Sequence, residues 1–194
     1  MQRQPSLLAS NTANDGTQDV PKGHFFEDLR AYREGLMAQG FWALQVYRFG
    51  HARFKIRSAL IRKPWGALHL VLSKLIEIIC GVSIGATARI GRRLVIEHFG
   101  GIVIHGHAVI GDDCVVRQGV TIGNKTLDKP LDAPTIGSRV NIGAGAKLLG
   151  NITIGDDCAI GANAVVITDV PSGCIAVGVP AIIKRVDRDK QTHE

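Results

Sequence analysis

A six-residue period of aliphatic side chains dominates the sequence between residues 84 and 166. A period of six fits neither the 3.6-residue repeat of an α-helix nor the two-residue alternation of a strand. It indicates a chain that runs straight for a few residues, turns and repeats, because Gly or another small residue usually follows the aliphatic one. The thirteen in-phase positions are Ile84, Ile90, Ile96, Ile104, Ile110, Val116, Ile122, Ile136, Ile142, Leu148, Ile154, Ile160 and Val166.

This period predicts a coil with an internal core. If each in-phase side chain points inward, three repeats make one triangular turn, and successive turns stack as parallel strands that bury their neighbours' apolar faces. The aromatic content of only 5% agrees with a narrow interior filled by small and β-branched residues. We therefore predict a mainly β fold, a parallel β-helix over residues 82–171, which forms the candidate catalytic domain.

The rest of the 194-residue chain divides into three segments. Residues 1–23 are polar and interrupted by Pro and Gly, which predicts a disordered tail. Residues 24–81 predict an α-helical N-terminal region, and residues 172–194 a C-terminal return segment and tail.

Three helices are expected within the N-terminal region. The first begins at Phe25, and Gly40 interrupts the pattern, so that a second helix begins near Phe41. The third is expected to begin at Pro64, because Pro favours the first helical position, and to end at Gly81.

The net charge of +6 permits an anionic partner. Nucleic acid is not expected, because basic and aromatic residues are not interleaved and no nucleic-acid motif is present. A phosphate-bearing cofactor or an anionic membrane surface fits better. The basic run between Arg48 and Lys63 is most simply a solvated helix face, and its second interpretation is contact with a membrane. The third helix is too short and too interrupted by charge to span one.

The cysteines favour a reducing compartment. The four of them form no Cys-x-x-Cys pair and no Cys/His metal spacing, so no metal is expected. Cys114 and Cys158 each follow Gly-Asp-Asp and should lie two turns apart on one face of the coil, as small buried residues. The N-terminus shows no signal peptide, and we expect a cytoplasmic protein.

The period fails twice, and both places are candidates for function, since extra residues must bulge from a regular coil. The first interruption holds Glu97, His98 and two glycines. A neutral imidazole can accept a hydroxyl proton, so His98 is the candidate general base. Glu97 could bind a substrate cation or tune the site. The second interruption, residues 125–134, predicts a loop over the site.

Several stretches resemble the serine acetyltransferases, a family of hexapeptide-repeat acyltransferases. They run from Gly91 through Glu97-His98-Phe99-Gly100-Gly101 to Ile104, and include Gly119-Val120-Thr121-Ile122-Gly123-Asn124, residues 143–151 and Gly178-Val179-Pro180-Ala181. The resemblance extends over most of residues 25–185. It implies that the β-helix is left-handed and that the chain forms a homotrimer or a dimer of trimers.

The resemblance also implies acetyl-CoA as co-substrate, with His98 as the base that activates an acceptor hydroxyl. The coenzyme would lie along the coil between neighbouring subunits. Its implied contacts are Gly123, Asn124, Ala144, Gly145, Lys147, Ala162, Gly178 and Lys184, the lysines as partners for phosphate.

Two departures from that family leave the acceptor open. The family has an Asp where this chain has Ser83, and an Arg-His pair where it has Asp132-Ala133. The hypotheses are therefore O-acetylation of L-serine for cysteine synthesis, O-acetylation of a sugar in exopolysaccharide assembly, as in the similar colanic-acid type of acetyltransferase, and a non-catalytic hexapeptide scaffold. His98 argues against the scaffold.

Overall fold

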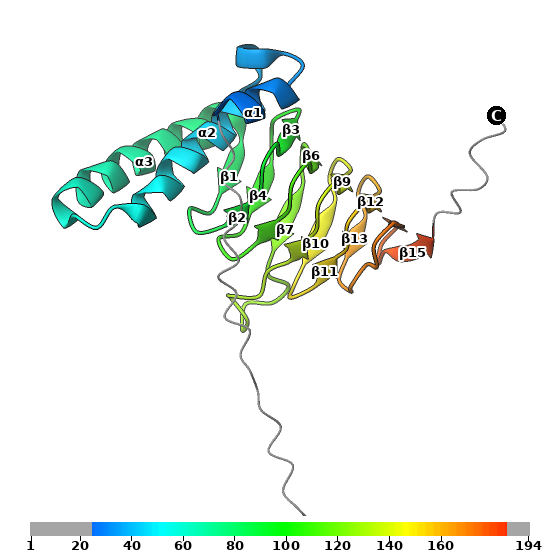
Figure 1. The fold of residues 1–194 in the computed structure, drawn as a ribbon. Coiled ribbons are helices and arrows are strands. Elements are labelled where there is room, and N and C mark those ends of the chain that lie inside the picture. The colour runs from blue at the N-terminus through cyan, green and yellow to red at the C-terminus, as the bar shows by residue number, and fades with distance from the viewer. Residues whose placement is uncertain (1–24, 186–194) are drawn as a thin grey trace, which may run out of the picture.

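The computed structural model describes residues 25–185, so the expected tail at residues 1–23 lies outside the described residues. A triangular β-coil carries a group of helices at its N-terminal end (Figure 1). None of the helices in this described part is long and apolar enough to cross a membrane.

The coil is built from three sheets that share the turns between them. Sheet A contains β1 (Val82–Ile84), β4 (Ile102–Ile104), β7 (Thr121–Gly123), β10 (Lys147–Leu149) and β13 (Val165–Val166). Sheet B contains β2 (Arg89–Ile90), β5 (Val109–Ile110), β8 (Thr135–Ile136) and β11 (Thr153–Ile154). Sheet C contains β3 (Val95–Glu97), β6 (Val115–Arg117), β9 (Asn141–Ile142), β12 (Ala159–Ile160), β14 (Cys174–Val177) and β15 (Ile182–Arg185).

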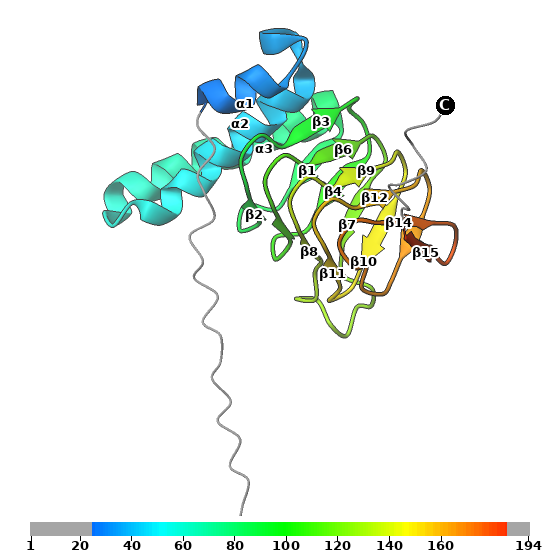
Figure 2. The ribbon, with the colours of Figure 1, turned by 45° about the vertical axis from the view of Figure 1, so that its right-hand side comes forward.

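The chain passes from sheet A to B to C and back, and every described strand pair is parallel except β14 with β15. We call the corners of the prism the A/B, B/C and C/A edges after the sheets that they join. Figure 2 shows the stacked turns from a second side.

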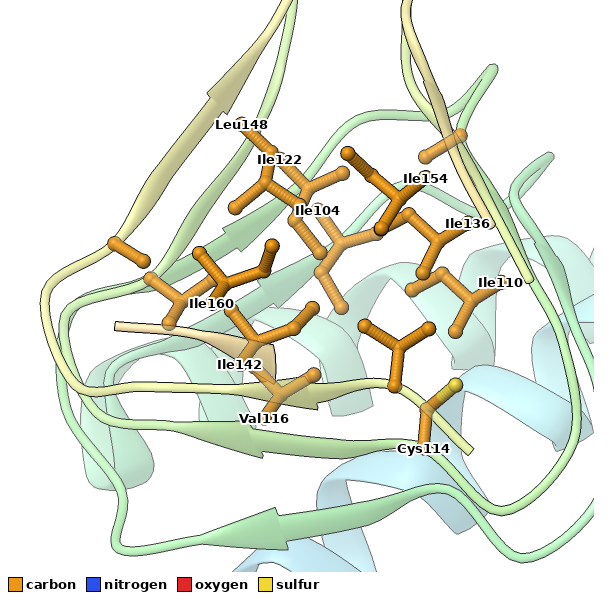
Figure 3. Packing of buried hydrophobic residues seen from close by; sticks show 14 of the residues in the cluster. Ile104, Ile110, Cys114, Val116, Ile122, Ile136, Ile142, Leu148, Ile154 and Ile160 are labelled. Carbon is orange, nitrogen blue, oxygen red and sulfur yellow. The ribbon is translucent and has the colours of Figure 1, made fainter. Parts of the chain in front are cut away.

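The predicted core is confirmed. Twelve of the thirteen in-phase residues are buried, and those labelled in Figure 3 point at the coil axis from three sides. Register explains this stacking, because Ile104 pairs with Ile122 and Ile110 with Ile136 in adjacent turns. Ile84 alone is partly buried, since β1 lies at the end of the coil.

The coil continues beyond Pro171. β14 pairs in parallel with β12, so that Ala176 lies beside Ile160. Between Val166 and Ala176 the spacing changes, and Val170 takes the next position of sheet B through a parallel bridge to Ile154 of β11. The sequence prediction ended the coil at residue 171 because Pro171 was expected to close it.

The N-terminal region is helical over its described residues, but two of the predicted helix boundaries were wrong. Its elements are α1 (Phe25–Ala31), the 3₁₀ turn η1 (Gly35–Met37), α2 (Gln39–Ala52), the 3₁₀ turn η2 (Arg53–Lys55) and α3 (Ala59–Cys80). Gly40 lies inside α2, because the helix approaches β3 so closely that a Cβ there would lie 2.3 Å from the carbonyl oxygen of Ile96. Pro64 lies inside α3, where it is exposed near the helix start.

These helices close the first turn of the coil with polar side chains. The Tyr32 hydroxyl donates to the carbonyl of Leu94 at 3.1 Å and accepts from the N–H of Ile96 at 3.0 Å. The Tyr47 hydroxyl donates to the carbonyl of Ala88 at 2.6 Å. Burial raises the pKa of Tyr47 to about 12, so this donor stays protonated.

Asp28 and Arg48 form the most buried polar contact of this end. The Arg48 guanidinium donates to both carboxylate oxygens of Asp28, at 2.5 and 3.0 Å, and to the carbonyl of Gly91 at 2.8 Å. The same carboxylate accepts the N–H of Arg93 at 3.0 Å, and its side chain is 0% exposed. One ion pair therefore joins α1, α2 and the coil.

Along the B/C edge, basic side chains of one turn pair with acidic side chains of the next. Arg92 pairs with Asp112 at 2.8 Å, Arg93 with Asp113 at 2.6 Å, and Arg139 with Asp157 at 2.7 Å. The hydrogen bond from Arg93 lowers the pKa of the Asp113 carboxyl. Behind this edge Cys114 and Cys158 are buried two turns apart, as predicted, and their thiols donate to carbonyl oxygens at 3.1 Å.

We predict that Asp28→Ala strongly destabilises the fold. The substitution leaves the guanidinium of Arg48 without its partner in a nearly dry site, which typically costs about 3–5 kcal/mol. Chemical denaturation should show this loss in the free energy of unfolding.

Glu34→Ala is the matched control, because it removes an exposed carboxylate from the same region and should change stability by less than about 0.5 kcal/mol. Equal effects of the two substitutions would contradict a structural role for the Asp28–Arg48 pair.

Candidate functional site

The first interruption of the period lies at the C/A edge between β3 and β4. Three residues separate Glu97 from Gly101, whereas one separates Arg117 from Gly119 in the next turn. The coil recovers its register at once, since the carbonyl of Gly100 accepts the N–H of Gly119 at 2.8 Å. The added length therefore bulges outward at this corner.

His98 and Phe99 occupy this bulge, and both are exposed. Within residues 25–185 no protein group forms a hydrogen bond to the imidazole of His98, which leaves its ring nitrogens accessible to a ligand. The backbone turns back through Gly100 and Gly101, with φ values of +112° and +66° that favour glycine. The edge thus presents one imidazole on a short rigid corner.

Glu97 turns away from this imidazole toward the next turn of sheet C. Its carboxylate pairs with the Arg117 guanidinium at 3.0 Å. Arg117 also donates to the side-chain oxygen of Asn141 one turn further on. Glu97 is thereby anchored on the outer face of sheet C, and the pair fixes the last residue before the bulge.

Four of the expected coenzyme contacts lie along the same edge as His98. The N–H of Gly145 donates to the carbonyl of Gln118, and the carbonyl of Ala144 accepts from Asn163, both at 2.8 Å. These backbone hydrogen bonds connect successive turns along the edge. Ala162 precedes Asn163 and is exposed, and Gly178 accepts from the N–H of Val165 at 3.0 Å. A row of small residues therefore extends from the His98 bulge toward β15.

The other four expected contacts lie elsewhere. Gly123 ends β7 at the A/B edge, on the opposite side of sheet A from His98, and Asn124 follows it. Lys147 lies on the outer face of sheet A, and its Nζ already donates to the carbonyl of Gly119 at 2.5 Å and to the Thr121 hydroxyl at 3.1 Å. Lys184 is exposed on β15.

The second interruption is an exposed loop between β7 and β8 at the A/B edge. Residues 125–131 are exposed, and Asn124 folds back to donate to the carbonyl of Thr126 at 2.9 Å. The loop returns through Ala133, which is buried in the coil core. The residue that stands where the resemblance expects a histidine is therefore part of the packing.

Ser83, the other departure, faces the helices. It lines a small cavity of about 40 Å³ between β1, α2 and α3, together with Tyr47, Ser73 and Glu77. Its neighbour in the sheet is Val103 on β4. The hydroxyl thus lies where the helical end meets sheet A.

Sequence reasoning missed a second histidine site. The N–H of His107 donates to Nδ1 of His105 at 3.2 Å, and the two rings are 5.4 Å apart. A Cβ added at Gly123 would lie 3.7 Å from the Cβ of His105, so the pair stands beside the start of the exposed loop. The sequence signal was the run Ile104-His105-Gly106-His107, which places two histidines between β4 and β5 at the A/B edge.

Comparison with known proteins places this architecture among the hexapeptide-repeat transferases. Residues 133–168 match the family described as bacterial transferase hexapeptide (six repeats). A serine acetyltransferase of Helicobacter pylori is 44% identical over 155 residues, which cover 80% of this chain and 85% of the relative.

Solved structures agree with this relationship. A serine acetyltransferase in complex with cysteine is 34% identical with a TM-score of 0.74, and the match covers 85% of this chain and 66% of that one. A serine acetyltransferase of Brucella abortus in complex with coenzyme A is 31% identical with a TM-score of 0.73, and the match covers 82% and 65%. This chain spans about two thirds of the length of these structures.

Proposed function

The chain belongs to the serine acetyltransferase family, and we propose that it transfers the acetyl group of acetyl-CoA to the hydroxyl of L-serine with His98 as general base. The observation that carries this proposal is the exposed imidazole in the bulge of the C/A edge, next to a row of small residues. A ring nitrogen that no protein group occupies is free to accept the proton of an incoming hydroxyl.

The proposed reaction needs one proton acceptor at the attacking oxygen. A ring nitrogen of His98 takes the hydroxyl proton as the oxygen attacks the thioester carbonyl. The tetrahedral intermediate then expels the coenzyme thiolate, which recovers the proton from the imidazolium. O-acetylserine and free coenzyme A are the products, and the chain contributes the base and the geometry.

The C/A edge supports a binding path for the pantetheine arm of the coenzyme. Ala144, Gly145, Ala162 and Gly178 have little or no side chain, so an extended ligand can approach their backbone. Lys184 is the better phosphate partner of the two candidate lysines, because the ammonium of Lys147 is already held by Gly119 and Thr121.

We place the complete site between neighbouring copies of the chain. His98 and the loop after Gly123 lie on opposite edges of sheet A, so one chain does not bring them together. A three-fold arrangement of triangular prisms would set the C/A edge of one copy beside the A/B edge of the next. A homotrimer is therefore our proposed unit, with a dimer of trimers as its larger form.

A sugar hydroxyl is the second candidate acceptor. It is favoured by the packing of Ala133 in the core and by Ser83 in the helix-side cavity, because both positions lack the charged or imidazole side chain expected for serine. A saccharide is bound mainly through neutral hydrogen bonds and does not require those groups.

Release of coenzyme A thiol, with L-serine as the sole acceptor, distinguishes the two acceptors. We expect a rate well above the hydrolysis of acetyl-CoA without acceptor. Glycine, which lacks the hydroxyl, is the matched control and should give only that background. A background rate with L-serine, together with coenzyme binding, would reject serine and favour the sugar.

His98→Gln should lower kcat by about 10²–10⁴-fold, the usual contribution of a positioned general base. Because the side chain is exposed and outside the core, the unfolding transition and the binding of coenzyme A should change little. Turnover within a few-fold of the unsubstituted enzyme would contradict the mechanism.

Glu97 is proposed to act as a positioning residue through Arg117. Glu97→Gln and Arg117→Gln should then have similar effects, each lowering kcat by about fivefold or less, because exposed ion pairs contribute about 0.2–1 kcal/mol. The pH dependence of kcat/KM distinguishes this positioning role of Glu97 from a direct action on His98. A direct action on His98 would shift the profile in Glu97→Gln alone, whereas an anchoring role leaves its midpoint unchanged in both variants.

A further inference from the structure

The outer face of α3 is apolar and uncovered. Its inner side packs on α2, where Trp65 stacks on Phe49 with ring centroids 4.5 Å apart. On the opposite side Leu68 and Leu75, one heptad apart, are about half exposed, and Ile78 is 79% exposed. The exposed aliphatic residues of this face are Leu60, Ile61, Leu68, Val71, Leu75, Ile78 and Ile79.

A continuous exposed apolar surface of this kind marks a site that binds another protein or a membrane. These side chains recur at three- and four-residue spacing along the 22-residue helix, so they form a stripe and not isolated exposures. Within residues 25–185 no other element packs against the stripe. Both views show the α2–α3 hairpin projecting beyond the coil, so its outer side is open to a large surface (Figures 1 and 2).

The charge around the stripe indicates what that occupant is. No Asp or Glu occurs between Glu34 and Glu77, whereas seven basic residues do, namely Arg48, Arg53, Lys55, Arg57, Arg62, Lys63 and Lys74. Asp28 holds Arg48, and Glu77 pairs with Lys74 at 2.6 Å. Arg57, Arg62 and Lys63 are exposed at the start of α3.

The tip of the hairpin also combines cations with aromatic rings. The Arg53 guanidinium lies 4.9 Å from the ring centroid of Phe54, and Phe54 is half exposed. Aromatic and basic residues beside an aliphatic stripe are typical of helices that lie in the headgroup region of a bilayer.

We propose that α3 docks this protein on an anionic membrane surface. The stripe enters the boundary of the acyl chains, and Arg57, Arg62 and Lys63 contact lipid phosphates. A second copy of the chain fits less well, because pairing two such faces would bring together two hairpins that each carry seven basic residues and only one acidic residue, Glu77. The helix lies along the surface and does not cross it.

Sedimentation of the full chain with vesicles tests this docking. Vesicles of phosphatidylcholine mixed with phosphatidylglycerol should carry the protein into the pellet at low salt and release most of it at high salt. Vesicles of phosphatidylcholine alone should bind it at least about tenfold more weakly. Failure to sediment with the anionic vesicles at low salt would overturn the proposal.

Two pairs of variants assign the contact to α3. Arg62→Gln with Lys63→Gln should weaken binding roughly tenfold to thirtyfold. Arg30→Gln with Arg33→Gln, which removes the same charge from exposed positions of the α1 region, should leave binding nearly unchanged. Equal losses in the two double variants would show that net charge alone drives binding and would overturn the assignment.

The apolar stripe is tested with Leu68→Gln and Leu75→Gln. This double variant should bind anionic vesicles at least about tenfold more weakly at an unchanged molar mass in solution. Leu127→Gln with Leu131→Gln, two still more exposed leucines of the loop between β7 and β8, is the control and should bind normally. A fall in molar mass for the α3 variant would show that a second copy covers the stripe and would overturn the proposal.

Discussion

The parallel stacking of turns is the constraint on which this structure depends. Each strand of a coil is satisfied by the turn above and the turn below, so the first and last turns carry unpaired backbone groups. Here the helical region closes the first turn with the hydroxyls of Tyr32 and Tyr47 and with the Asp28–Arg48 pair, while β15 covers the edge of β14. The helical region is therefore part of the β fold's stability and not an appendage to it.

The same stacking determines where chemistry can occur. A regular turn buries its in-phase side chain and repeats, which leaves its edges smooth, so a ligand-sized feature requires extra residues. The two interruptions supply them at opposite edges of sheet A, with His98 on one and the Asn124-to-Ala133 loop on the other. The remaining B/C edge carries the charge ladder from Arg92 to Asp157 and has no interruption of the period.

The fold was predictable because the six-residue period extends over residues 84–166, so a single residue that departs from it does not change the prediction. Ile84 is less buried than its counterparts, yet the phase of the coil was correct. Helix boundaries were less predictable, because the close approach of α2 to β3 requires Gly40 inside the helix, and Pro64 lies within α3 and not at its first position. Among the site residues, the sequence located the His98 bulge, but neither the partner of Glu97 nor the contacts of Lys147 follows from spacing, since both depend on side chains one turn away.

Because the two interruptions lie on different edges, only some residues of the A/B edge can contact the acceptor. The position filled by Ala133 faces the core, so the return of the A/B loop is fixed by packing, and only the exposed part of the loop can vary its contacts with a substrate. His105 and His107 stand beside that part and are imidazoles on the A/B edge in a chain that lacks the expected loop histidine. In a three-fold assembly this pair would approach the His98 bulge of the adjacent copy, and acceptor choice would then depend on residues of two chains.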